Sequence, residues 1–168
     1  MIDYEKLTKT LEALGYRVSH FATAQQAAAY LDGQIDQTSV AFGGSVTLKD
    51  MDLYPLLSKH NQVIWHWEGG SQMDAINTQV YITSVNGLAE TGELINIDGT
   101  GNRVASTCFG HQELYLILGV NKVAPDYEGA LWRARNIAAP LNARRLHRKT
   151  PSGAPGTLPL PKMPSAWG

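Results

Sequence analysis

Short β-prone runs that alternate with stretches of helical periodicity restrict the fold of this chain more than any other feature. Helical patterns cover residues 3–14, 24–31, 46–59 and 126–137. Runs rich in β-branched and aromatic residues, typical of strands, cover residues 16–21, 39–42, 62–67 and 79–85. This alternation predicts an α/β fold: a three-layer, mostly parallel sheet with helices on both faces.

Two further segments complete the predicted sheet. Asp98-Gly99 followed by Gly101 is typical of a hairpin turn, because such turns need positive φ. We therefore expect residues 93–97 and 103–108 to form antiparallel neighbouring strands. The continuous apolar run at residues 114–118 predicts a strand covered on both faces.

The length of 168 residues suits one domain, which we place at residues 1–150. Five of the eight prolines follow residue 150, so residues 151–168 are expected to form an extended or disordered tail. No apolar run approaches the roughly 20 residues that cross a bilayer, which favours a soluble protein without a membrane partner. The single cysteine, Cys108, excludes an internal disulfide, is compatible with the cytoplasm, and is expected to be a small buried apolar residue.

Charge is distributed unevenly along the chain. Residues 1–128 carry 7 Lys and Arg against 15 Asp and Glu, whereas residues 129–168 carry 7 and none. The basic segment could attract an anionic ligand or nucleic acid, or it could pack against acidic surface of its own or a neighbouring protomer. Because no nucleic-acid motif accompanies it, we expect no nucleic-acid partner and favour packing, which leaves a homo-oligomer open.

A glycine turn is the first candidate for chemistry. Gly43 and Gly44 lie where a strand feeds a helix, a place where backbone N–H groups can converge on a phosphate or carboxylate. Ser45 and Thr47 could add hydroxyl donors, but the lysine of a Walker loop is absent and the pattern is not that of a Rossmann loop. A tight turn with Ser45 capping the helix explains the same residues equally well.

A dense polar segment at residues 86–103 is the second candidate. Arg103 could clamp an oxyanion, and Glu90, Glu93 or Asp98 could act as a general base if burial raised its pKa. The alternative is that residues 98–102 are turn chemistry and the glutamates are solvated. The other candidate ligand-binding residues of this segment are Asn86, Gly99, Gly101 and Asn102.

Residues just beyond the last apolar strand are the third candidate. Ligands of open α/β sheets bind beyond the carboxyl ends of the strands, which makes Asn121 and Lys122 candidate anion partners. A lysine that snorkels to solvent at a strand end is the alternative. The five histidines have no metal-site spacing, so neither a metal nor another cofactor is predicted. Trp65 and Trp67 are read as one face of a strand and not as a stacking platform.

Four segments together resemble the LUD-domain, or lactate-utilisation, family, in particular its small stand-alone members of the lactate-utilisation protein C type. They are Phe42-Gly-Gly-Ser-Val-Thr47, the long segment from Thr83 to Val104 with its Asn-Gly-Leu-Ala-Glu-Thr-Gly and Asp-Gly-Thr-Gly-Asn-Arg motifs, Gly119-Val-Asn-Lys122, and Arg133-Ala-Arg-Asn-Ile-Ala-Ala-Pro140. The resemblance covers residues 38–146. It implies a fold similar to the ribose-phosphate isomerase, glucosamine-phosphate deaminase and CoA-transferase group, with the glycine-loop, hairpin and Gly119 to Lys122 segments converging on one cleft.

The resemblance also implies two functions. In the first, the chain binds a small organic anion, a carboxylate or phosphate, and acts with iron–sulfur and oxidoreductase partner subunits in the oxidation of L-lactate to pyruvate. In the second, it is an acid–base isomerase or acyl or CoA transferase that uses Glu90 with the glycine loop. The family's cysteine-rich tail is missing, since Lys149-Thr-Pro151 is followed by Ser152, and 168 residues leave no room for a ferredoxin-like domain.

Overall fold

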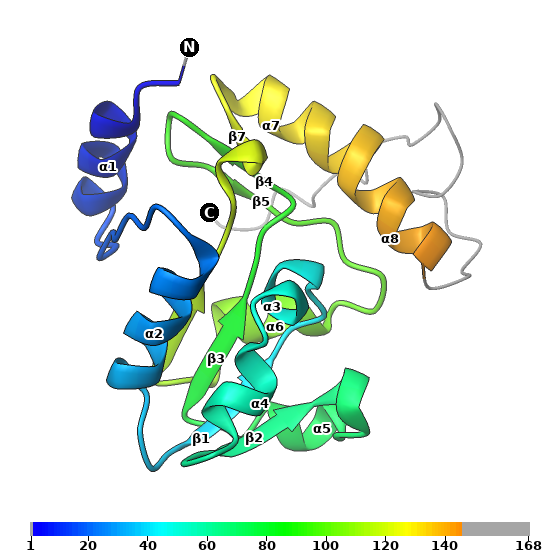
Figure 1. The fold of residues 1–168 in the computed structure, drawn as a ribbon. Coiled ribbons are helices and arrows are strands. Elements are labelled where there is room, and N and C mark those ends of the chain that lie inside the picture. The colour runs from blue at the N-terminus through cyan, green and yellow to red at the C-terminus, as the bar shows by residue number, and fades with distance from the viewer. Residues whose placement is uncertain (1, 146–168) are drawn as a thin grey trace, which may run out of the picture.

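The computed structural model describes residues 2–145, which form two sheets (Figure 1). The larger sheet has the strand order β2-β1-β3-β6, and all three pairings are parallel. Its strands are β1 (Ser39–Phe42), β2 (Gln62–Trp65), β3 (Val80–Thr83) and β6 (Glu113–Leu116). Because the strands are parallel, the loops that follow β1 and β3 leave the sheet at the same edge.

The smaller sheet extends from that edge. It has the order β5-β4-β7, with β4 antiparallel to β5 and parallel to β7. Its strands are β4 (Gly87–Ala89), β5 (Leu94–Ile95) and β7 (Val123–Ala124). Since β4 begins four residues after β3 ends, the chain passes from one sheet to the other through residues 84–86.

Helices surround the sheets. They are α1 (Tyr4–Ala13), α2 (Ala24–Gln34), α3 (Val46–Asp50), α4 (Leu53–Leu57), the 3-10 turn η1 (His66–Glu68), α5 (Gln72–Ala75), α6 (Asn102–Cys108), the 3-10 turn η2 (Val120–Lys122) and α7 (Tyr127–Arg133). The π-helical segment η3 (Ala134–Ala138) continues α7 directly into α8 (Ala139–Arg145). Figure 1 shows these last three elements as one long helix, drawn from yellow to orange.

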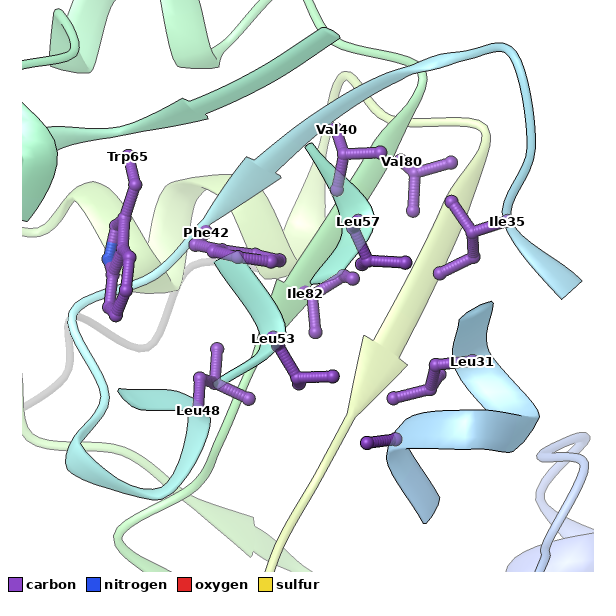
Figure 2. Close-up of a cluster of buried hydrophobic side chains, with 11 residues drawn as sticks. Leu31, Ile35, Val40, Phe42, Leu48, Leu53, Leu57, Trp65, Val80 and Ile82 are labelled. Atoms are coloured by element: carbon purple, nitrogen blue, oxygen red, sulfur yellow. The ribbon is translucent and has the colours of Figure 1, made fainter. Parts of the chain in front are cut away.

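The main core lies between the larger sheet and helices α2, α3 and α4. In β3, Val80 and Ile82 point into this core, where Figure 2 shows Ile82 beside Leu53 and Leu57 of α4. Tyr81 points to the opposite face, where its ring stacks on His111 at 4.9 Å between ring centroids. Both faces of β3 are therefore buried, and the predicted mostly parallel α/β sheet with helices around it is confirmed.

Several helices begin directly after a residue whose side chain caps the first turn. Thr23 accepts a hydrogen bond from the Gln26 backbone N–H, which begins α2. Ser45 begins α3 in the same way, and Asp126 begins α7. The predicted helix over residues 46–59 is divided into α3 and α4.

Three predictions of secondary structure are wrong. Residues 103–108 belong to α6 and not to a hairpin strand, because the Asp98 carboxylate accepts backbone N–H groups that begin a helix. Residues 16–21 form no strand. Residues 114–118 are not covered on both faces, since Leu114 is exposed and the following residues of the segment are only partly buried.

Cys108, expected to be buried, is exposed at the end of α6. The proline-rich segment at residues 151–168 and the basic residues Arg148 and Lys149 lie outside the described residues. Within residues 2–145, every helix is too short or too polar to cross a membrane.

Gly87 tests the contact between β4 and α7. A Cβ atom at Gly87 would lie 2.6 Å from the backbone oxygen of Ala130, which cannot move without displacing the helix. We expect Gly87→Ala to lower the free energy of unfolding by about 1–3 kcal/mol, the usual cost of overpacking. Urea denaturation monitored by circular dichroism measures it.

Gly33→Ala is the matched control. A Cβ atom there meets nothing within 4 Å, and alanine is the better helix former by up to about 1 kcal/mol. This variant should be as stable as the original protein or more so. Equal stability of Gly87→Ala would contradict the close packing.

Candidate functional site

The glycine turn lies against β3. The Gly43 N–H donates to the Ile82 carbonyl at 2.9 Å, and a Cβ atom on Gly43 would lie 2.3 Å from Thr83 Oγ1. Neither Gly43 nor Gly44 has positive φ, so close approach of the backbone is what requires glycine at position 43. Ser45 is buried and caps α3, because its hydroxyl accepts from the Leu48 N–H at 3.4 Å.

Arg103 connects the polar segment to this turn. Its side chain is 8% exposed, and its guanidinium donates to the Gly44 carbonyl at 2.5 Å and to Asn96 Oδ1 at 3.5 Å. The third guanidinium nitrogen, Nε, is buried and has no hydrogen-bond partner among the described residues. The structure therefore brings together two segments 59 positions apart in the sequence.

Asp98 holds Arg103 in place through the backbone. Its Oδ2 accepts the N–H groups of Arg103 at 2.7 Å and Val104 at 3.2 Å, and its Oδ1 accepts from Gly99 at 3.1 Å. Gly101, with φ of +83°, makes the turn into α6, and Asn102 accepts from the Thr100 hydroxyl. These contacts give Asp98, Gly99, Gly101 and Asn102 a role in shaping the turn that presents Arg103.

Lys122 reaches the same place from η2. Its ammonium donates to Ser84 Oγ at 2.7 Å and to Thr47 Oγ1 at 3.0 Å. Ser84, which directly follows β3, is 2% exposed. Burial, followed by the charges of Arg133 and Arg103, lowers the pKa of the Lys122 ammonium to about 8.

Arg133 lies behind Lys122 at the end of α7. Its guanidinium donates to the backbone carbonyls of Asn121, at 2.8 Å, and of Asn86. The Asn86 side chain accepts from the Ile97 N–H at 2.7 Å, so this residue joins the segments on either side of it. Burial lowers the pKa of the Arg133 guanidinium. Two of the three predicted asparagines, Asn86 and Asn121, thus meet Arg133 through their backbone oxygens.

A third arginine lies near the glycine turn. The Arg145 guanidinium carbon is 4.2 Å from the ring centroid of Trp67, which in turn stacks on Trp65. Trp67 lies in η1, beyond the end of β2, so the prediction that Trp65 and Trp67 form one face of a strand is wrong for Trp67. Burial, then repulsion from Arg145 and Arg103, lowers the pKa of the neighbouring His66. The described contacts of Arg145 are with Trp67 and Asn142, and not with acidic surface.

The resulting charge balance is strongly positive. None of the salt bridges found within residues 2–145 involves Arg103, Lys122, Arg133 or Arg145. We call these four residues the cationic cluster. In the same part of the chain, no group of three or more His, Cys, Asp and Glu side chains is placed to hold a metal ion.

Glu90 forms its contacts elsewhere. Its carboxylate accepts from the Asp3 backbone N–H and from the Lys6 ammonium, each at 3.1 Å. These two bonds hold the pKa of Glu90 below its usual range. The predicted condition for a general base, a raised pKa, is therefore not met. Glu93, the neighbouring candidate, accepts from the Thr91 hydroxyl on an exposed surface.

Sequence reasoning missed five residues of this arrangement: Ser84, His66, Trp67, Arg133 and Arg145. Ser84 was missed because the predicted strand ran to residue 85, whereas β3 ends at Thr83 and places Ser84 directly beyond the carboxyl end of the strand, as Gly43 is beyond β1. Arg145 was part of the basic segment alone, and Arg133 was also part of a resemblance motif, but helical spacing does not show which face of the helix meets the sheet.

Comparison with known proteins identifies one family. Residues 4–160 match the family model described as the LUD domain. No curated protein matches the chain.

Glu90→Gln tests the contact with α1. A carboxylate with a lowered pKa stabilises the folded state above the unfolded value of about 4.3, and this stabilisation is lost as the pH falls below it. We expect Glu90→Gln to be less stable than the original protein at pH 7 and to approach it at pH 3. Chemical denaturation at several pH values measures the difference.

Glu12→Gln is the control for this experiment, because Glu12 is an exposed glutamate of α1, the helix that Glu90 contacts. It should show a smaller difference at every pH. If the stability difference between Glu90→Gln and the original protein grew towards acidic pH, the contacts of Glu90 with Asp3 and Lys6 would be contradicted.

Proposed function

The chain belongs to the LUD-domain family, and from this premise we propose that it binds a small organic anion, a carboxylate or a phosphate, between Arg103 and Lys122. Membership places it among lactate-utilisation proteins. The position of the anion rests on the residues that meet at the glycine turn.

The observation that carries the proposal is a pair of cations removed from water without a carboxylate partner. Arg103 is 8% exposed and Lys122 is partly buried, and the described hydrogen bonds of both side chains are with neutral oxygens. The neighbouring Asp98 carboxylate accepts from the Arg103 backbone N–H and not from its guanidinium. Burying an unpaired charge costs several kcal/mol in real proteins, about as much as many whole domains have in reserve. An anion between the two side chains would offset this cost.

The groups around the two cations suit an oxyanion. Arg103 Nε is a buried donor without an acceptor among residues 2–145, and a guanidinium can bind a carboxylate or phosphate through two parallel hydrogen bonds. The hydroxyls of Ser84 and Thr47 already contact Lys122 and can donate to a ligand oxygen that it binds. Arg133 and Arg145 add positive potential without occupying the same place.

We further propose that this anion site serves the oxidation of L-lactate to pyruvate. That oxidation removes two electrons and two protons, so an electron acceptor is required. The chain has one cysteine, Cys108, which cannot by itself ligate an iron–sulfur cluster. Iron–sulfur and oxidoreductase partner subunits would supply the acceptor, with this chain binding the substrate or product.

The alternative, an isomerase or acyl transferase with Glu90 as its base or nucleophile, has less support. Glu90 is engaged by Asp3 and Lys6, and its lowered pKa makes it a weak base. No described contact joins it to Arg103 or Lys122.

Arg103→Gln tests the anion site directly. The substitution removes the charge and at least one donor, and a hydrogen bond to a charged group contributes about 1.5–3 kcal/mol. We expect the affinity for the best of pyruvate, lactate and inorganic phosphate to fall by roughly tenfold to a hundredfold. Isothermal titration calorimetry measures it, with circular dichroism to verify folding.

Arg17→Gln is the matched control. It removes the same charge from an exposed position outside the cationic cluster, and should change the affinity less than about twofold. Equal losses of affinity in Arg103→Gln and Arg17→Gln would show that the anion is attracted by the net charge of the protein alone. Absence of binding by the original protein would overturn the anion site.

Growth on lactate tests the wider role. In cells that carry this gene, its deletion should abolish growth with L-lactate as the carbon source while growth on pyruvate persists. The original gene and Arg17→Gln should restore growth, and Arg103→Gln should not. Normal growth of the deletion strain on lactate would remove the redox part of the proposal and leave anion binding intact.

A further inference from the structure

We propose that Lys122 is a nucleophile that forms an imine with the carbonyl group of a 2-oxo acid bound in the cationic cluster. This inference rests on the proposed anion site and names the chemical class of its ligand. It assigns to Lys122 a covalent role that charge neutralisation alone does not require.

The geometry around the Lys122 amine carries the inference. Two hydroxyl oxygens hold Nζ, Ser84 Oγ at 2.7 Å and Thr47 Oγ1 at 3.0 Å, and they come from different elements of the fold. Among the described residues no carboxylate forms a salt bridge with this amine. A carboxylate would hold the lysine in its protonated, non-nucleophilic form, whereas a hydroxyl accepts from the ammonium and can donate to the neutral amine.

The charged groups that face Lys122 also favour the neutral amine. Arg133 of α7 and Arg103 of α6 lie close enough to oppose its protonation, and burial acts in the same direction. Together they lower its pKa to about 8, so that at pH 7 it holds about two orders of magnitude more neutral amine than an ordinary lysine. Neighbouring cations and desolvation are the known means of activating an amine towards carbonyl groups.

The reaction needs no other reactant. The lone pair of Nζ attacks the carbonyl carbon, so that a C–N bond forms and the C=O π bond breaks, and one Nζ proton passes to the oxygen to give a carbinolamine. The second Nζ proton leaves in the next step with the hydroxyl group as water. Loss of that oxygen as water leaves a C=N bond. The hydroxyls of Ser84 and Thr47 are in contact with Nζ and can pass protons to and from the oxygen.

The cluster selects the rest of the ligand. When the carbonyl carbon lies at Nζ, a carboxylate on the neighbouring carbon lies among Arg103 and the other cations. A neutral ketone has no charge with which to bind these cations. A 2-oxo acid carries both groups on neighbouring carbons. A 2-hydroxy acid offers the carboxylate without the electrophilic carbon and would bind reversibly.

Reductive trapping tests the inference. The original protein is incubated with pyruvate and sodium cyanoborohydride, which converts an imine into a stable secondary amine, and the modified lysine is located by peptide mass spectrometry. We expect Lys122 to be labelled at least about tenfold faster than the exposed Lys59, because desolvation and the neighbouring cations favour the neutral amine at Lys122. The rate should rise with pH and level off above about pH 8, where Lys122 is neutral.

Two probes and two variants complete the experiment. Lactate, which has no carbonyl group, and acetone, which has no carboxylate, should each fail to label Lys122 selectively. Lys122→Arg should yield only the slow labelling of exposed lysines, even at a pyruvate concentration that saturates its own thermal shift. Lys49→Arg, which changes an exposed lysine of α3, should be trapped at Lys122 at the original rate.

The outcomes separate this inference from the anion site. Binding of pyruvate without selective trapping at Lys122 overturns the imine and leaves the anion site standing. Equal labelling of Lys59 and Lys122, or equal labelling by acetone, also overturns it. If neither pyruvate nor lactate binds and nothing is trapped, both proposals fail.

Discussion

The hydrogen bond from the Arg103 guanidinium to the Gly44 carbonyl is the interaction on which the candidate site depends. It joins the turn after β1 to the start of α6, two segments that share no strand pairing. Asp98 makes the bond possible by capping α6 through the backbone, which sets the direction in which Arg103 leaves the helix. Gly43 makes it possible from the other side, because a side chain there would push the turn away from β3.

The site is assembled from parts of the fold that tolerate little movement. Ser84 lies in the connection between the two sheets, directly after a fully buried strand, and Lys122 lies one residue before β7. The cations that meet there donate to backbone carbonyls, as Arg103 does at Gly44, or to side-chain hydroxyls, as Lys122 does at Ser84 and Thr47. Such an arrangement keeps charges apart from water before any ligand arrives, which is the condition for strong electrostatic binding.

Much of the fold could be predicted from the sequence, because periodicity and capping residues act locally. The helix begun by Thr23, the strand ending at Phe42 and the turn at Gly43 all follow from neighbouring residues. The failure at residues 103–108 has the same origin: Asp98-Gly99 suits a hairpin turn and a helix start equally, and the choice depends on Asp98 reaching the Arg103 N–H. Strand order was beyond local signals, which is why the edge position of β6 was missed.

The π-helical segment Ala134–Ala138 sets the rotational phase of the long C-terminal helix. Arg133 and Arg145 are 12 positions apart, about 3.3 turns of a regular α-helix, which would turn them roughly 120° away from each other. A π-turn takes up one extra residue, so the two arginines behave as if about 11 positions apart, close to three whole turns. Both side chains consequently contact the same side of the molecule, Arg133 at Asn86 and Arg145 at Trp67. The irregular turn thus corrects the rotational phase, so that one helix presents two positive charges, about three turns apart, towards the same side of the molecule.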